Sequence, residues 1–155
     1  MARRNLKTSK NHGIRPGPAP EGKKLRFNWM TPFILSHYDS KTLYAGANYV
    51  FKSENRGDKW TCISPDLSTN PGPERQGNVP FGTITDISES ALNKGLLFAG
   101  TDDGELHVTK DDGATWTKIN NGLPNRWVSR VVASRYDAGT VFVSLTGYRE
   151  DDFEA

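Results

Sequence analysis

Short apolar segments recur along the chain from residue 32 onward, and turn residues separate them. Segments such as 42–45 and 96–100 are rich in branched and aromatic side chains, and Gly, Asn and Asp lie at their ends. No stretch of any length places apolar side chains at the three- and four-residue spacing of a helix. Runs of this kind are typical of antiparallel strands joined by short turns. The pattern predicts an all-β fold.

The predicted strands form repeats of four. The first repeat holds strands at 32–36, 42–45, 49–52 and 59–63, and the second at 83–88, 96–100, 105–109 and 115–119. A third repeat begins with strands at 129–134 and 140–145. The second strands align with one another as 43–46, 97–100 and 141–144. The first interval is longer because the turn-rich stretch 65–73 is inserted there, and we expect that stretch to be an irregular loop.

Each full repeat contains the same eight-residue pattern, Ser/Thr-x-Asp/Asn-x-Gly-x-x-Trp, which we call the first box (53–60) and the second box (109–116). The short polar side chain can accept hydrogen bonds from backbone N–H groups two residues further on, and the glycine supplies a positive φ. We interpret both boxes as structural braces of a hairpin turn. Asn in the first box cannot do the acid–base chemistry that Asp in the second could. The box residues are Ser53, Asn55, Gly57, Trp60, Thr109, Asp111, Gly113 and Trp116.

The boxes resemble the Asp-box, or BNR repeat, of sialidase-like and sortilin-like β-propellers. Longer runs at 26–36, 43–48 and 60–67 resemble an internal segment of large bacterial proteins described as glycosyl hydrolases with BNR, sortilin-like repeats. The resemblance covers roughly residues 5–155. It implies a partial β-propeller of about two and a half four-stranded antiparallel blades. The implied division is a leader at 1–26, a first blade with its loop insert at 27–79, a second blade at 80–124 and the first half of a third at 125–155.

Two and a half blades cannot close a ring, because propellers use about four to eight blades around a central channel. Either the chain is part of a longer protein or several copies assemble head to tail. The open end would expose the edge of the strand at 140–145 and the apolar faces of the end blades. We therefore expect a homo-oligomer that completes the propeller.

The net charge of +2 conceals an uneven distribution. Residues 1–26 carry eight basic and one acidic side chain, a net charge of +7, whereas the rest carries twelve basic and seventeen acidic, −5. The Pro and Gly content of the leader predicts an extended or disordered segment. It could be a solvated linker, an arm for nucleic acid or another anionic polymer, or a tail that docks on the acidic body of a neighbouring copy. We favour the linker and expect no nucleic-acid partner, since the leader lacks aromatic side chains for base stacking.

A ligand site in a propeller of this kind would lie at the end of the blades opposite the boxes. Aromatic side chains beside Arg and Asn could stack on a sugar ring and bind its hydroxyl groups there. The alternative is that Trp29 and Trp127, which both precede first strands, pack between blades. The candidate binding residues for carbohydrate or protein are Trp29, Arg126, Trp127, Tyr148 and Arg149.

The predicted function is a non-catalytic structural or binding module that self-associates. The alternative is a sialidase-like glycoside hydrolase whose site forms only when subunits close the ring, because such hydrolysis needs two facing carboxylates. Asp102 and Asp103 are weak candidates for these, although their place between two strands is typical of a hairpin turn. Three scattered histidines offer no metal-ligand spacing, and we predict neither a metal nor a cofactor.

The sequence predicts no association with a membrane. No apolar run approaches the roughly 20 residues that a bilayer helix needs. The residues after Met1 lack the apolar core of a signal peptide, so the sequence as given indicates a cytoplasmic location. The resemblance implies instead that longer relatives are exported.

Overall fold

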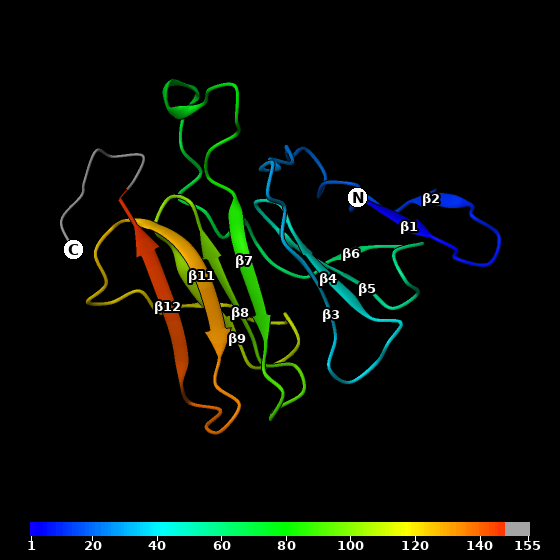
Figure 1. Ribbon diagram of the computed structural model, residues 1–155. Helices are drawn as coiled ribbons and strands as arrows, with labels where there is room; N and C mark the ends of the chain where they lie inside the picture. Colours follow the sequence, from blue (N-terminus) through cyan, green and yellow to red (C-terminus); the bar gives the residue numbers. More distant parts are fainter. Residues whose placement is uncertain (148–155) are drawn as a thin grey trace.

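The computed structural model describes residues 1–147 and places three antiparallel sheets beside one another in an arc (Figure 1). The first sheet has the order β3-β4-β5-β6, and the second has the order β7-β8-β9-β10. The third sheet pairs β11 with β12. The strands of the first sheet are β3 (Phe33–Leu35), β4 (Leu43–Gly46), β5 (Val50–Ser53) and β6 (Thr61–Cys62). Those of the other two are β7 (Ile84–Glu89), β8 (Leu97–Thr101), β9 (Leu106–Thr109), β10 (Thr117–Lys118), β11 (Trp127–Ala133) and β12 (Val141–Thr146).

The sheets pack as successive blades. Strand β7 contacts β3 and β4 of the first sheet, and β11 in turn contacts β7 and β8 of the second. Within each four-stranded sheet, strands adjacent in sequence are adjacent in space, which makes each sheet a simple antiparallel meander. The described residues contain no α-helix. The predicted all-β, partial-propeller fold is confirmed, and every predicted strand of the repeats lies within two residues of the observed one.

Close approach between blades depends on glycine at one repeated position of the second strands. A Cβ on Gly46 would lie 2.9 Å from the Cβ of Ile84 in the next sheet. A Cβ on Gly100 would lie 2.9 Å from the Cβ of Val128, again in the next sheet. Interiors are close-packed, so even one added methyl group needs space that these contacts do not leave. Apolar clusters fill the space between sheets, with Val128 and Ile84 fully buried.

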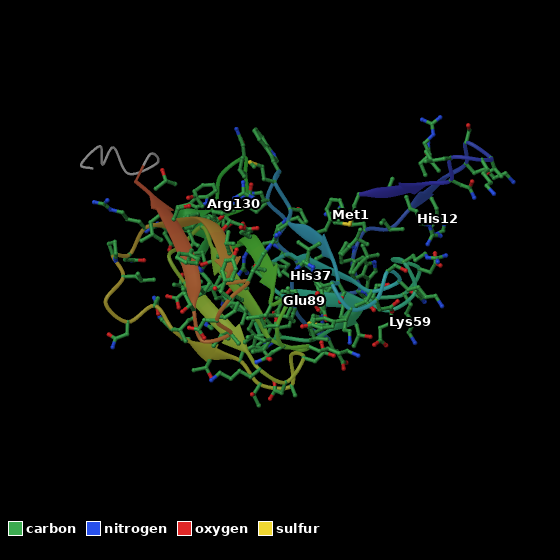
Figure 2. All side chains as sticks on the ribbon, turned by 60° about the horizontal axis from the view of Figure 1, so that its bottom comes forward. Met1, His12, His37, Lys59, Glu89 and Arg130 are labelled. Carbon is green, nitrogen blue, oxygen red and sulfur yellow. The ribbon has the colours of Figure 1, made fainter. Side chains whose placement is uncertain are left out.

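A polar contact reinforces the first of these interfaces. The Glu89 carboxylate, at the end of β7, accepts hydrogen bonds from the Ser36 hydroxyl (2.9 Å) and from the His37 backbone N–H (2.6 Å). Figure 2 shows the labelled His37 and Glu89 next to each other at this junction. Glu89 is 4% exposed, and a buried carboxylate needs such donors. The second sheet is thereby fixed to the turn between β3 and β4.

The insert at 65–73 is less irregular than the sequence predicted. It leads into a short 3-10 helix, Pro73–Arg75, and Leu67 within it is 1% exposed against the apolar cluster between the first two sheets. The Leu67 backbone N–H donates to the Asn48 carbonyl. One buried leucine therefore anchors a stretch whose turn residues alone indicate a loop.

The leader is ordered, so of the two predicted alternatives, extended or disordered, the structure agrees with the first. Its first residues form a hairpin of β1 (Ala2–Arg4) and β2 (Asn11–Gly13), and Ile14 behind it is 6% exposed. Leu25 and Phe27 pack against the cluster that holds Phe51 and Trp60. Average composition suggested disorder because it is dominated by charged and turn residues, whereas Ile14, Leu25 and the adjoining Phe27 provide the contacts. Among the described residues, no helix is long and apolar enough to cross a bilayer.

Candidate functional site

The two boxes adopt the same hydrogen-bonded turn. In the second box the Thr109 hydroxyl donates to the Asp111 carboxylate (2.7 Å) and accepts from the Gly113 N–H (2.9 Å). The Asp111 carboxylate also accepts from the Thr115 N–H at 2.9 Å. The first box repeats this arrangement, with distances of 2.9, 2.8 and 2.8 Å for the corresponding bonds of Ser53, Asn55, Gly57 and Lys59.

Two details of the turn differ from the sequence interpretation. The polar side chain accepts from the N–H four residues further on, not two, and the Ser or Thr hydroxyl receives the glycine N–H. Moreover, the residue before each glycine also has a positive φ, 61° at Arg56 and 58° at Asp112. Two successive left-handed residues favour glycine at the second of them, where φ is 89° in Gly57 and 94° in Gly113.

The hydrogen bonds to Asp111 explain its acidity. Hydrogen bonds from the Thr115 hydroxyl and N–H and from the Thr109 hydroxyl favour the ionised carboxylate and lower the pKa of Asp111 to about 2. A carboxylate with this pKa cannot deliver a proton near neutral pH. Since Asn55 makes the equivalent contacts in the first box, the geometry of Asp111 is that of a brace.

The two box tryptophans differ in one contact. The Trp116 indole N–H donates to the Ile63 carbonyl of the preceding sheet at 2.8 Å. Trp60 is 8% exposed, and its indole N–H has no acceptor in the described part of the chain. A buried donor without a partner costs about 1–3 kcal/mol.

Asp102, one of the two weak catalytic candidates, lies in the turn between β8 and β9 and is 3% exposed. One carboxylate oxygen accepts from the Thr83 N–H at 2.7 Å, and the other from the Thr83 hydroxyl at 2.7 Å and the Asn28 amide at 3.3 Å. Burial raises the pKa of Asp102, while the Thr83 hydrogen bonds act in the opposite direction. Asp102 thus fixes the loop that leads into β7, and its oxygen atoms are already engaged.

Asp103, the second candidate, is 9% exposed and holds the insert loop. One oxygen accepts both the Thr69 N–H and the Thr69 hydroxyl at 2.7 Å, and the other accepts the Thr101 hydroxyl. Sequence spacing could not reveal this role, because Thr69 is 34 residues away. The described residues contain no group of three or more His, Cys, Asp or Glu side chains that could hold a metal ion.

Of the candidate binding residues that the structure describes, only Trp29 lines a groove with other aromatic side chains. Trp29, 81% exposed, lines an aromatic groove of about 490 Å³ that also includes Phe27, Phe33 and Arg15. The Arg15 guanidinium lies 4.5 Å from the centre of the Phe27 ring, a cation–π contact. Neither Arg126 nor Trp127 lines this groove. Trp127 instead opens β11 and is half-buried, whereas Tyr148 and Arg149 lie outside the described residues.

A surface that the sequence analysis did not single out by residue lies on the outer face of the third sheet. Phe142 of β12 is 63% exposed, and its cross-strand partner Val132 is 48% exposed. The equivalent residues of the earlier repeats are buried, Tyr44 at 3% and Phe98 at 5%. The alignment of 43–46, 97–100 and 141–144 contained this signal, because in the first two repeats the next blade covers the aromatic position. We call Val132 and Phe142 the open face.

Comparisons with known proteins give distant likenesses. No protein-family model matches the sequence. No curated protein matches it either. Among solved structures, a GH74 enzyme from Niastella koreensis is 14% identical, with a TM-score of 0.44, over 70% of this chain and 14% of that one. YCF48 from Cyanidioschyzon merolae is 16% identical, with a TM-score of 0.45, over 76% of this chain and 30% of that one. The chain spans less than a third of either protein and is too distant from both to inherit an activity.

Proposed function

We propose that this chain is a non-catalytic propeller module of the Asp-box class that functions by binding other blades through its open face, and that it self-associates. The observation that carries the proposal is the exposure of Phe142, at a position where the two equivalent aromatic residues are almost fully buried by a following blade. An exposed apolar side chain at a position that is buried in the other repeats is typical of an interaction site.

The geometry of the carboxylates favours a binding role over the hydrolase alternative. Asp102 and Asp103 brace two loops with all four of their oxygen atoms, and Asp111 braces the second box. A glycosidase needs one carboxyl group free to protonate the leaving group and a second facing the sugar. None of these three side chains is free for either task. The boxes themselves support membership of the Asp-box class, because both use the same set of hydrogen bonds.

The proposal is tested by the absolute mass of the purified chain, measured by light scattering over a range of concentrations. We expect an oligomer that dissociates on dilution. Phe142→Lys should weaken it by at least about thirty-fold in Kd, because the loss of a central aromatic anchor costs about 2 kcal/mol or more. The control is Tyr136→Lys, which replaces an aromatic residue that is 97% exposed in the turn between β11 and β12. A chain that is monomeric at every concentration would overturn the proposal.

Carbohydrate binding is a second candidate, favoured by the aromatic groove alone. Trp29 and Phe33 expose 81% and 55% of their surface beside Arg15. An exposed indole next to a cation can stack on a sugar ring while the cation binds hydroxyl groups. Titration with cello- and malto-oligosaccharides, followed by tryptophan fluorescence, should give a saturable change that Trp29→Ala abolishes. No change with the native chain would remove this candidate for the sugars used.

A further inference from the structure

The leader hairpin has the strand register of the outer half of a blade. Ala2 pairs with Gly13 in the leader, Phe51 with Cys62 in the first sheet, and His107 with Lys118 in the second. The two residues of each pair are eleven positions apart. Adding 49 to the number of a leader residue therefore gives its equivalent in the first sheet, such as Phe51 for Ala2. The three hairpins therefore share one pairing register, although the leader loop lacks the box sequence.

The hairpin also docks on the first sheet as the first sheet docks on the second. A Cβ on Gly113 would lie 2.8 Å from the Cβ of Ile63, the residue after β6. A Cβ on Gly57 would lie 2.7 Å from the Cβ of Ile14, the residue after β2. Ile14 plus 49 is Ile63, so the same residue type fills the same place. The leader residue therefore substitutes for the last residue of a preceding outer strand.

Both hairpins also contact the following box through a basic side chain, which comes from the strand at the third position of a blade. Lys52 of β5 reaches the second box, with its Nζ 2.6 Å from the Asp112 carboxylate. Arg3, its equivalent in β1, reaches the first box, with Nη1 3.0 Å from the Arg56 carbonyl and Nη2 2.9 Å from the Asp58 carboxylate. Arg56 occupies the same box position as Asp112. The hairpin is thus placed as the outer half of a blade that would precede the first one.

Two features show that this half-blade is incompletely seated. The Trp60 indole N–H is unpaired, whereas its counterpart Trp116 donates to the Ile63 carbonyl. Beside the Arg3 contacts, a cavity of about 660 Å³ lies between Arg4 and Asn5 of the hairpin and the first box. Seating the hairpin more deeply would bring the carbonyl of Ile14, the equivalent of Ile63, toward Trp60.

The other end of the arc has the complementary half. β11 and β12 are the inner two strands of a blade, and no other strand of the described residues pairs with β12 along residues 141–145. The edge of β1 is equally unpaired. The Ile14 N–H donates to the Met1 carbonyl and the Asn5 N–H to the Lys10 carbonyl, so by strand alternation the backbone groups of Ala2 and Arg4 face away from β2. Figures 1 and 2 place the hairpin, with His12, and the third sheet, with Arg130, at opposite ends of the molecule.

We propose that the β1–β2 hairpin of a second copy of this chain completes the third sheet, with β1 adding to the edge of β12 to form one four-stranded hybrid blade. The repeat fixes the register, because Leu43 pairs with Ser53 and Ala45 with Phe51 in the first sheet. The equivalent pairs are Val141 with Arg4, and Val143 with Ala2, of the second copy. This proposal rests on the self-association proposed above and names the segment that pairs with the edge of β12, beside the open face.

The copy number follows from the blades. The described residues of each copy hold two complete blades, one outer half and one inner half, which amounts to three blades in that part of the chain. Two copies joined at both ends make a ring of six, within the range of about four to eight that propellers use, whereas three copies would make nine. The partner is a second copy, and the assembly is a closed dimer.

The test distinguishes the contribution of the hairpin to dimerisation from that of the open face. Arg4→Pro removes a backbone N–H that faces the free edge of β1 and leaves the hydrogen bonds between β1 and β2 in place. Its matched control, Arg4→Ala, retains the N–H and should dimerise like the native chain. We expect Arg4→Pro, like Phe142→Lys, to be monomeric by light scattering at concentrations where the native chain is dimeric. A mixture of these two variants should form a heterodimer, because one intact hairpin then meets one intact third sheet.

Each outcome of this experiment bears on one proposal. A native chain that never associates overturns the proposed function and the hybrid blade together. A native dimer that Phe142→Lys dissociates and Arg4→Pro leaves intact retains the open face as an interface but overturns the hybrid blade. A second readout does not depend on the fold of the Pro variant. In a Cys62→Ser background, Ala2→Cys with Val143→Cys should give an intermolecular disulfide on mild oxidation, and Ala2→Cys with Tyr136→Cys should not.

Discussion

At the scale of single residues, the box turn is fixed by a glycine that has two separate reasons to be there. Gly113 has a φ of 94°, and a Cβ at this position would lie 2.6 Å from the Ile63 carbonyl oxygen of the preceding sheet. Gly122 has a φ of 82° with nothing within 4 Å of its added Cβ. A comparison of these two glycines therefore distinguishes the cost of backbone strain from the cost of crowding by a neighbouring side chain.

Gly122→Ala should lower the free energy of unfolding by about 1–2 kcal/mol, the cost of a left-handed non-glycine residue. Gly113→Ala should cost about 1–3 kcal/mol more, because the methyl group also has to displace Ile63. Urea denaturation of both variants beside the native chain measures the difference. Equal losses would mean that Ile63 and the box turn can separate at no cost.

Residue roles were predictable from the sequence only where the partners are near in the chain. The box hydroxyl, carboxylate and glycine lie within eight residues, and the repeat revealed them as a turn. The roles of Asp102 and Asp103 depend on Asn28 and Thr69, which are 74 and 34 residues away. The place of Trp29 in a groove depends on Phe27 and on Arg15 of the leader, whose fold the composition did not reveal.

At the scale of elements, successive sheets approach closely because the second strand of each blade presents a glycine to the first strand of the next. Gly100 faces Val128, which is fully buried. The third repeat has Ser144 at the aligned position. Its hydroxyl lies 2.9 Å from that of Ser129 across the sheet.

Gly100→Ala should destabilise the chain by about 1–3 kcal/mol, because φ is not the obstacle at this position and the added methyl group overpacks the interface. Val128→Ala alone should cost a similar amount through the cavity that it leaves. The double variant should lose at least about 1 kcal/mol less than the sum, since the smaller side chain makes room for the methyl group. Strictly additive losses in urea denaturation would contradict direct packing between the two.

The strands and their turns followed from the apolar runs, whereas the leader hairpin did not. Asn11-His12-Gly13 has none of the branched or aromatic side chains that mark a strand. What holds it is its neighbour Ile14 against Gly57, a contact visible only when the leader is aligned with the outer strand that ends at Ile63.

At the scale of the whole molecule, one arginine joins three segments distant in sequence. Arg26, at the end of the leader, donates to the Gly82 carbonyl before the second sheet (3.0 Å) and forms an ion pair with the Asp66 carboxylate in the insert (2.9 Å). The same guanidinium donates to the Asn70 side chain and the Ser68 hydroxyl at 3.1 and 2.7 Å. A planar group with five donors can serve all these acceptors at once.

Arg26→Lys should loosen the insert, because a lysine ammonium cannot reproduce the planar set of contacts. We expect limited proteolysis to cleave the chain within 65–82 several-fold faster than in the native protein. The control is Arg135→Lys, at an exposed position in the turn between β11 and β12. An unchanged rate would show that Leu67 alone holds the insert.

The overall architecture could be predicted because the repeat is visible in the sequence, and an arc of repeats has few ways to pack. Its completion by further copies remains a prediction. The two surfaces that would meet lie near opposite ends of the chain, and no local pattern connects them. Only the shared register of the β1–β2 and β5–β6 hairpins indicates that they belong to one blade.

The position of the second sheet between the other two has a consequence for how the chain opens. Strands β7 and β8 contact a neighbour through β3 and β4 on one side and through β11 on the other. In an array where each unit is stabilised by its neighbours, the flanked unit opens last and the ends fray first. In the monomeric chain, hydrogen exchange should therefore be slowest at the amides of β8 and should quicken toward both ends of the arc, so that the middle blade is the last part of the chain to admit solvent.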